Sequence, residues 1–182
     1  MPVLAFTTFA IMKAPYGDPV VKGFEDLTPS TFAAAEQSPG FIERATEQGE
    51  PAPHLSNFEQ NWGKWGNFAV PRFYDGGYSL ATDTRACTLS LWCDINSVHN
   101  FVYRSLHRKA LAKRAEWFRK PEWPTYAMWW VPDHAIPTWE EASARLEHLH
   151  DHGATPIAFG FHRRFSPSDC PLELTLSTPI AA

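Results

Sequence analysis

One stretch of the chain repeats chemically useful side chains at the spacing of a helix face. Residues 101–118 read FVYRSLHRKALAKRAEWF, and steps of 100° per residue put Tyr103, His107, Ala110, Arg114 and Trp117 in one narrow stripe. Neutral imidazole can take up a proton near neutral pH, guanidinium can bind a carboxylate or phenolate, and a tyrosine hydroxyl can donate to an oxyanion. The stripe therefore predicts acid–base chemistry, with His107, Tyr103 and Arg114 as catalytic residues.

Each of these residues also has a structural interpretation. His107 can hold a helix break, because the earlier apolar residues point to another side of the wheel and predict a bend near 105–106. Arg114 can pair with an internal acid such as Glu43, and Tyr103 can pack at a rim. The other charged residues fall on the far side of the wheel, where a solvated face is expected: Arg108, Lys109, Glu116, Arg119 and Lys120.

Further candidate ligand contacts lie on the predicted strands and loops. An aromatic ring can stack on a flat ligand, although buried tryptophans more often fill a core. His134 follows Asp133, which either orients the imidazole or forms a turn. The expected substrate-binding residues are Ser90, Trp92, Trp117, Trp129, Trp130 and His134.

No metal site and no organic cofactor are expected. The sequence contains no glycine-rich phosphate loop, no GxSxG motif and no CxxC pair. His148 and His152 are four residues apart and can share a cation, but no third ligand is evident nearby.

Strands and helices alternate along the chain. Strands are predicted at 3–12, 40–46, 84–94, 125–131 and 156–162, and helices within 18–38, at 95–118 and at 139–152. Thr138 and Glu141 form a capping box for the last helix. This order is the split βαβ pattern of a ferredoxin-like α+β fold, with an antiparallel sheet and helices on one face. We expect one domain, residues 1–165, with an inserted segment at about 47–84 and a tail at 166–182.

Neither face of the predicted sheet suits open water. Leu89 and Leu91 face one side of the strand and Ser90 and Trp92 face the other, so neither face of the sheet suits exposure to solvent. The predicted helices cover only one face, so the other face needs a further covering element. The simplest covering element is the sheet of a second copy of the chain. This pattern predicts a homodimer with a barrel-like interior, whose wall includes Thr88, Ser90 and Trp92. The aromatic inserted segment is either a lid over that pocket or an added β-ribbon.

A resemblance supports this architecture. Residues 89–111, LSLWCDINSVHNFVYRSLHRKAL, resemble a strand-then-helix segment of the antibiotic-biosynthesis monooxygenase-like superfamily of dimeric α+β barrels, which carries a strand tryptophan and a Ser-x-His. Together with SPGF at 38–41 and WWVPDHAIPTWEEASARLEHLHDHGATPIAFGF at 129–161, the helix stretch is similar to a barrel family known only as a domain of unknown function. The similarity leaves out about 47–82 and the tail after Phe165.

The resemblance implies a dimeric barrel with an internal pocket. It matches His107 to the Ser-x-His histidine and Trp92 to the strand tryptophan, and it matches Arg114, Trp117, Trp129 and His134 to motifs of the smaller family. It implies no single reaction, because the superfamily contains cofactor-free oxygenases, haem enzymes, isomerases, cyclases and proteins without known activity.

The amino-acid composition limits the classes of partner that are expected. The 182 residues carry a net charge of −4, which provides no general field for nucleic acid, and no apolar run is long enough to cross a membrane. Three cysteines without a pairing pattern fit the reducing cytoplasm. We therefore expect a homodimeric enzyme performing cofactor-free oxygenation, isomerisation or cyclisation of an aromatic or conjugated metabolite. The alternatives are a haem enzyme with His107 as axial ligand, and a non-catalytic binding or assembly module.

Overall fold

The computed structural model describes residues 1–50, 54–104 and 107–169, with the side chains of His107 and Lys109 outside the description. Four strands and four helices form within these ranges. In chain order they are β1 (Val3–Ile11), α1 (Lys22–Glu36), β2 (Phe41–Arg44), β3 (Arg85–Trp92), α2 (Ile95–Arg104), α3 (His107–Trp117), β4 (Tyr126–Val131) and α4 (Trp139–His152). The protein is thus a mixed α+β fold.

The strands form one antiparallel sheet in the order β2-β3-β1-β4. β1 and β3 are central, since each pairs with a strand on both sides, and β-branched and aromatic residues dominate β1. β1–α1–β2 and β3–α2–α3–β4 are the two crossovers, which is the connectivity that the sequence predicts. The registers place Leu4 opposite Trp92 and Ile11 opposite Arg85.

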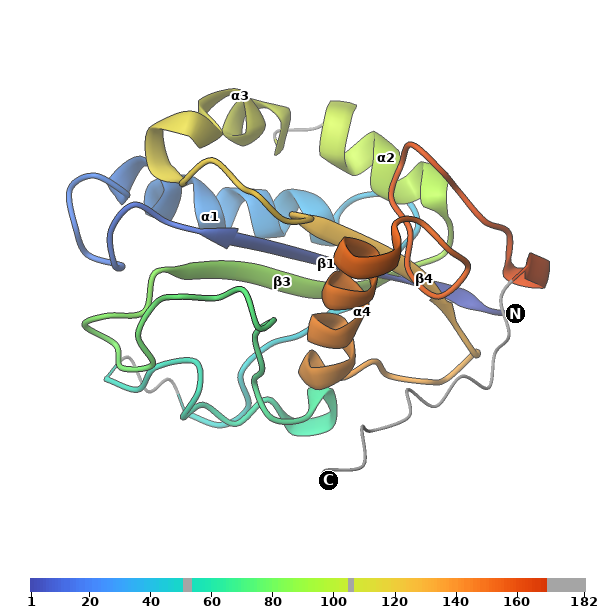
Figure 1. Ribbon diagram of the computed structural model, residues 1–182, viewed down its shortest axis with the longest axis horizontal. Helices are drawn as coiled ribbons and strands as arrows, with labels where there is room; N and C mark the ends of the chain where they lie inside the picture. The colour runs from blue at the N-terminus through green and yellow to red at the C-terminus, as the bar shows by residue number, and fades with distance from the viewer. Residues whose placement is uncertain (51–53, 105–106, 170–182) are drawn as a thin grey trace.

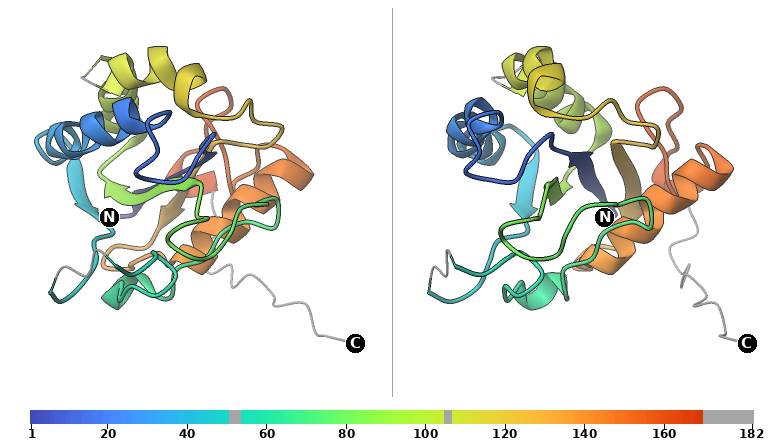
Figure 2. Two further views of the ribbon diagram at one scale, coloured as in Figure 1. Left: turned by 90° about the vertical axis from the view of Figure 1, so that its left-hand side faces the viewer. Right: turned by 60° about the vertical axis from the view of Figure 1, so that its left-hand side comes forward.

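The sheet is covered on both faces by this chain (Figures 1 and 2). Helices α1, α2 and α3 lie over one side, called here the groove face, which carries Thr8, Thr88 and Ser90. Helix α4 and the segment 54–84 lie over the other side, called the closed face, which carries Leu89 and Trp129.

The expectation that all helices share one face is therefore wrong. Trp139, Ala142 and Leu146 of α4 pack on the closed face, because these apolar residues form one stripe of the helix. The inserted segment adds buried aromatic residues to the same side: Trp62, Trp65, Phe68 and Tyr74. The face away from α1, α2 and α3 is thus covered from within the chain, and Thr88, Ser90 and Trp92, which were expected to wall a barrel between two copies, lie instead on the face under these three helices.

The inserted segment is neither a lid over the groove face nor a β-ribbon. Within residues 54–84 the described structure is irregular, apart from one 3-10 turn at Gly63–Trp65. The interlocking rings of Trp62, Phe68 and Trp139 hold it to the sheet, with centroids 4.8–5.7 Å apart.

The start of α4 and the boundary between α2 and α3 test two local predictions. Thr138 Oγ1 accepts a hydrogen bond from Glu141 N at 3.1 Å, so the predicted N-cap is confirmed. Helix α2 ends at Arg104 and α3 begins at His107, on either side of the predicted bend, and residues 105–106 lie outside the described ranges.

The predicted fifth strand at 156–162 is wrong. Phe159 makes an isolated bridge to Met128, with N–O distances of 2.8 and 2.9 Å. Thr155 bridges Ala158 just before it, so a tight turn limits the extended backbone to that one pair.

Candidate functional site

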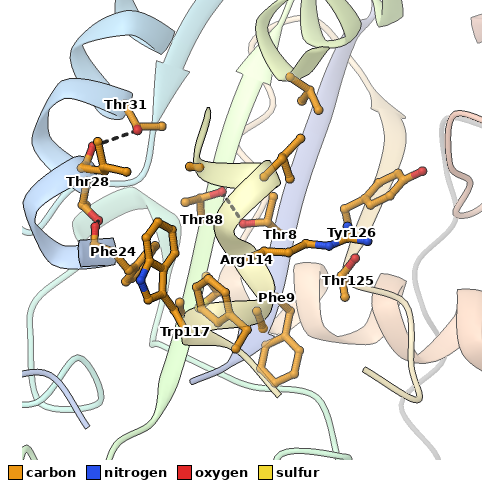
Figure 3. A pocket seen from close by; sticks show the side chains of 18 of the residues that line it. Thr8, Phe9, Phe24, Thr28, Thr31, Thr88, Arg114, Trp117, Thr125 and Tyr126 are labelled. Atoms are coloured by element: carbon orange, nitrogen blue, oxygen red, sulfur yellow. Dashed lines mark hydrogen bonds between the residues drawn. The ribbon is translucent and has the colours of Figure 1, made fainter. Parts of the chain in front are cut away.

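A groove of about 690 Å³ lies between the groove face of the sheet and helices α1 and α3 (Figure 3). Its floor comes from residues of β1 and β3, its walls come from both helices, and the end of α2 contributes Phe101, Val102 and Tyr103. Its volume lies within the range of about 300–1,000 Å³ that small-molecule pockets occupy.

Two threonines form a polar pair in the middle of the floor. Thr8 and Thr88 face each other across the paired strands, and their Oγ1 atoms are 2.8 Å apart. Two hydroxyls share one hydrogen in such a bond, so one hydroxyl hydrogen remains for an acceptor in the groove. Thr28 and Thr31, on the α1 wall, instead donate to backbone carbonyls of their own helix.

One end of the groove, called here the aromatic end, is formed by Phe41, Trp92 and Phe101. The Trp92 ring stacks on Phe101 at 5.3 Å and meets Phe41 edge-on at 5.2 Å. Trp92 Nε1 donates to Ser90 Oγ at 2.9 Å, and Ser90 Oγ donates to Phe6 O at 3.2 Å. Ser90 therefore fixes the orientation of the indole.

The other end, called the cationic end, carries Lys13, Arg114, Arg119 and Lys120. Backbone hydrogen bonds bring these residues together, because Lys13 N donates to Trp117 O and Arg119 N donates to Ile11 O, at 2.8 and 2.9 Å. Arg119 and Lys120 were expected on the solvated side of a continuous helix. That expectation is wrong because α3 ends at Trp117 and the chain then runs back beside β1.

The lining is unbalanced in charge. Five of the described lining residues are basic, Arg44 together with the cationic end, whereas none of them is aspartate or glutamate. Arg44 pairs with Glu36 at 2.8 Å and Arg119 pairs with Asp75 at 3.0 Å. Lys13 Nζ donates to Ala115 O at 2.7 Å.

Arg114 lines the groove and its side chain extends across it in Figure 3. Within the described residues this side chain has no hydrogen bond or ion pair. The alternative of a pair with Glu43 is wrong, because the Glu43 carboxylate binds Lys64 Nζ at 2.7 Å. Arg114 is exposed, so water solvates its charge where no protein group does.

Four of the five residues of the predicted helix stripe line the same groove: Tyr103, Ala110, Arg114 and Trp117. The Tyr103 ring packs against His99 and Phe161, at 4.8 and 5.5 Å. The Trp117 indole fits over Gly23 of α1, where a Cβ would lie 3.0 Å from Nε1. His107 is the first residue of α3, but its side chain lies outside the described part.

The other predicted binding residues lie elsewhere. Trp129 is 1% exposed in the closed-face core, where the Arg145 guanidinium lies 5.6 Å from its ring. Trp130 is covered by the segment after α4, and its Nε1 donates to Phe165 O at 2.8 Å. The His134 side chain is 92% exposed in a loop, 3.8 Å from Asp133. None of the three is among the described residues that line the groove.

Sequence reasoning missed several lining residues. Lys120 was placed on the wrong side, and Thr8, Tyr16 and Tyr126 were not considered. Burial raises the pKa of Tyr126, while the hydrogen bond that its hydroxyl accepts from Phe161 N opposes the shift. The alternation Phe6, Thr8, Ala10 along the first strand was the available signal, because small and polar residues there face the helices.

A smaller cavity of about 390 Å³ adjoins the groove and is called here the side pocket. Tyr16, Arg44, Cys87 and Thr88 border both spaces, at the edge of β3 that β2 leaves unpaired. Burial raises the pKa of the Tyr16 hydroxyl to about 12, although the residue as a whole is 42% exposed.

A buried ion pair lines the side pocket. Arg85 Nη2 contacts Asp83 Oδ2 at 2.7 Å, with side chains 4% and 7% exposed. Tyr74 Oη donates to Asp83 Oδ1 at 3.0 Å, and the Phe68 ring lies 4.4 Å from the guanidinium. Burial raises the pKa of the neighbouring Cys87 thiol, and the Arg85 charge opposes this. The pair balances its own charges.

Within the described ranges no three His, Cys, Asp or Glu side chains are grouped so as to hold a metal ion. No helix in the same ranges has the length and apolar character needed to span a bilayer.

Comparison with known proteins gives one match. A family model described as "Domain of unknown function (DUF3291)" matches residues 3–174. No curated protein and no solved structure matches the chain.

Proposed function

The chain belongs to the DUF3291 family, whose function is unknown, and we propose from its groove that it is an enzyme that acts on a small aromatic or conjugated metabolite by proton transfer. The observation that carries the proposal is a hollow of about 690 Å³ kept open beneath three helices. Protein interiors are normally packed without such spaces, and an unfilled one costs stability. A ligand that fills it would recover that cost.

The lining favours an aromatic or conjugated ligand. Rings surround the aromatic end, and the threonine pair in the middle offers a hydrogen-bond donor to a ligand oxygen. Arg114 and the Tyr103 hydroxyl border the same space, where they would stabilise an enolate or phenolate. The groove needs no organic cofactor for this chemistry.

His107 is the proposed proton carrier. It precedes the lining residues Ala110, Leu111 and Arg114 by three, four and seven positions on one helix, and these spacings share a helix face. Among the described lining residues none is aspartate, glutamate or histidine, and burial raises the pKa of Tyr16 and Tyr126. The proposal therefore rests its acid–base step on His107.

Ligand binding is tested by filling the groove. Ala110→Trp adds an indole to the α3 wall, and Ala112→Trp adds the same group to the exposed side of the same helix. The fluorescence of anilinonaphthalene sulfonate should rise with the unchanged protein and with Ala112→Trp, and should stay low with Ala110→Trp. Equal fluorescence in both variants would contradict binding in the groove.

Proton transfer is tested with phenylpyruvate, whose keto–enol exchange needs only a proton carrier. The protein should accelerate ketonisation of the enol, followed by absorbance, and His107→Ala should abolish the acceleration. His134→Ala is the control, because that side chain is exposed outside the groove. Binding without acceleration would leave a non-catalytic binding module.

Haem is the alternative cofactor. Its two carboxylates suit the cationic end, and iron would need His107 as axial ligand. Titration with haem should give a Soret band that His107→Ala removes if this alternative holds. A chain that leaves the haem spectrum unchanged would exclude it.

The homodimer and the monooxygenase-like superfamily remain part of the proposal. Because α4 and the segment 54–84 cover the closed face, a second copy would have to pair at a sheet edge or over the mouth of the groove. The mass in solution, from light scattering across a range of protein concentrations, tests the dimer.

A further inference from the structure

We propose that the groove binds an amphipathic carboxylate in one orientation, with the acidic group at the cationic end and the apolar body directed toward the aromatic end. This inference rests on the proposed function, because it names the ligand class of the same groove. It depends on charge, on the pairing of each cation and on the direction of the strands.

The charge of the groove opposes that of the whole chain. The sequence has 20 acidic and 16 basic residues, yet the described lining holds five basic residues and no acidic one. A neutral or cationic ligand would leave these positive charges without a partner as it displaced water from them. A negatively charged group gains from the same arrangement.

Two of the five basic side chains are free to bind a negatively charged group of the ligand. Arg44, Arg119 and Lys13 already contact Glu36, Asp75 and the Ala115 carbonyl. The side chains of Arg114 and Lys120 have no hydrogen bond or ion pair to any described residue. A guanidinium presents two parallel N–H groups that match the two oxygens of a carboxylate, so Arg114 favours a carboxylate over a single-atom acceptor.

The strands fix the direction of the ligand. The aromatic end lies at the start of β1, because Leu4 pairs with Trp92. The cationic end lies at the finish of β1, because Ile11 O accepts from Arg119 N. Seven residues separate Leu4 from Ile11, which corresponds to about 23 Å at the usual rise per strand residue. An elongated ligand with one charged terminus fits this space, and the Thr8–Thr88 pair lies between the two ends.

The ligand class is tested with three compounds that share one apolar body. Naphthoate, naphthylmethanol and naphthylmethylamine are each titrated into the full chain by calorimetry. We expect naphthoate to bind about tenfold more tightly than the alcohol, as one charge-assisted hydrogen bond would provide, and the amine to bind most weakly. Naphthyl phosphate binding more tightly than naphthoate would replace the carboxylate by a phosphate and overturn the assignment.

The two cations are tested by matched substitutions. Arg114→Met and Lys120→Met should each weaken naphthoate binding several-fold and leave naphthylmethanol binding unchanged. Arg108→Met and Lys113→Met remove the same charges from exposed positions of α3 that do not line the groove, and should change neither affinity. Equal losses in the lining and control variants would mean that net charge alone is responsible, and would overturn the inference.

The orientation is tested with a naphthoate brominated at the ring position farthest from the carboxylate. In a crystal of the complex, the bromine located by its anomalous signal should lie on the Trp92 side of the bound molecule, and the carboxylate on the Lys120 side. A signal beside Lys120 would reverse the orientation and refute it.

Failure of this inference differs from failure of the proposed function. If none of the three compounds binds, the groove is not a small-molecule site and the function fails. If all three compounds bind with equal affinity, the groove is a small-molecule site but the assignment of a carboxylate ligand is wrong. If the groove is instead filled by a second copy, the chain will be a dimer that Ala110→Trp converts to a monomer, and both proposals fail.

Discussion

The two faces of the sheet use the same strands for opposite purposes. On the closed face, the paired residues Thr7 and Leu89 are 2% and 1% exposed, and Leu89 packs against aromatic rings of the inserted segment and α4. On the groove face, the adjacent residues Thr8 and Thr88 leave space under the helices. Because strand side chains alternate, one run of sequence builds a filled core and a hollow at once. The comparison teaches that stability and ligand binding are separable here by side-chain direction.

The largest expected contrast concerns the tryptophans. Trp129→Ala should lower the free energy of unfolding by about 3–5 kcal/mol, because a fully packed ring leaves a cavity in the closed face. Trp117→Ala should cost less, about 1–3 kcal/mol, because part of that ring already borders the groove. Urea unfolding measures both. Naphthoate affinity should fall only for Trp117→Ala, and the reverse result would break the comparison.

A buried and an exposed ion pair should differ strongly. Asp83→Asn leaves the buried Arg85 charge without a counter-ion and should cost about 3–5 kcal/mol. Adding Arg85→Met should recover part of this loss, because the unpaired charge is then gone while the introduced amide oxygen can still accept from the Tyr74 hydroxyl. Asp75→Asn, in an exposed pair beside the groove, should change stability by less than about 1 kcal/mol. Equal costs would show that burial is not the cause.

Alkaline pH should destabilise the folded protein mainly through Tyr74 on the closed face. Burial raises the pKa of Tyr74 from 10.0 to about 12, so the folded state holds its proton more tightly than the unfolded state. This contribution is complete below pH 10 and is lost between pH 10 and 12, amounting to about 2–3 kcal/mol. Tyr74→Phe should flatten the decline of stability over that range. Tyr16→Phe should flatten it less, because Tyr16 is partly exposed. Parallel curves for both variants and the unchanged protein would refute the assignment.

The smallest effect is expected in the floor of the groove. Thr88→Val removes one member of a hydroxyl pair that borders open space, so stability should change by less than about 1 kcal/mol. A ligand with an oxygen midway along its body should lose affinity, whereas naphthoate should not. A large loss of stability from Thr88→Val would mean that the groove face is packed as tightly as the closed face.

Much of the fold could be predicted because local patterns decide it. The four strands, the helix boundaries near 105–106 and the Thr138 cap follow from alternation, periodicity and capping chemistry. The helix stripe also predicts that Tyr103, Arg114 and Trp117 share one space, which depends only on helix geometry.

The rest depends on contacts between distant segments. Nothing local says that α4 and residues 54–84 fill the closed face, since their apolar residues would suit a partner chain equally well. Trp129 looks like Trp92 in sequence, and only the strand register puts the two on opposite faces. Arg119 and Lys120 were misplaced because the turn after Trp117 is set by hydrogen bonds to β1.

The shortness of β2 has a consequence for selectivity within the family. β2 has four residues against eight in β3, so Arg85 to Thr88 have no strand beside them on that edge within the described residues. The groove and the side pocket meet at this gap. Relatives whose second strand is longer by two to four residues should have two isolated compartments, and they are expected to exclude branched ligands long enough to reach from one compartment into the other.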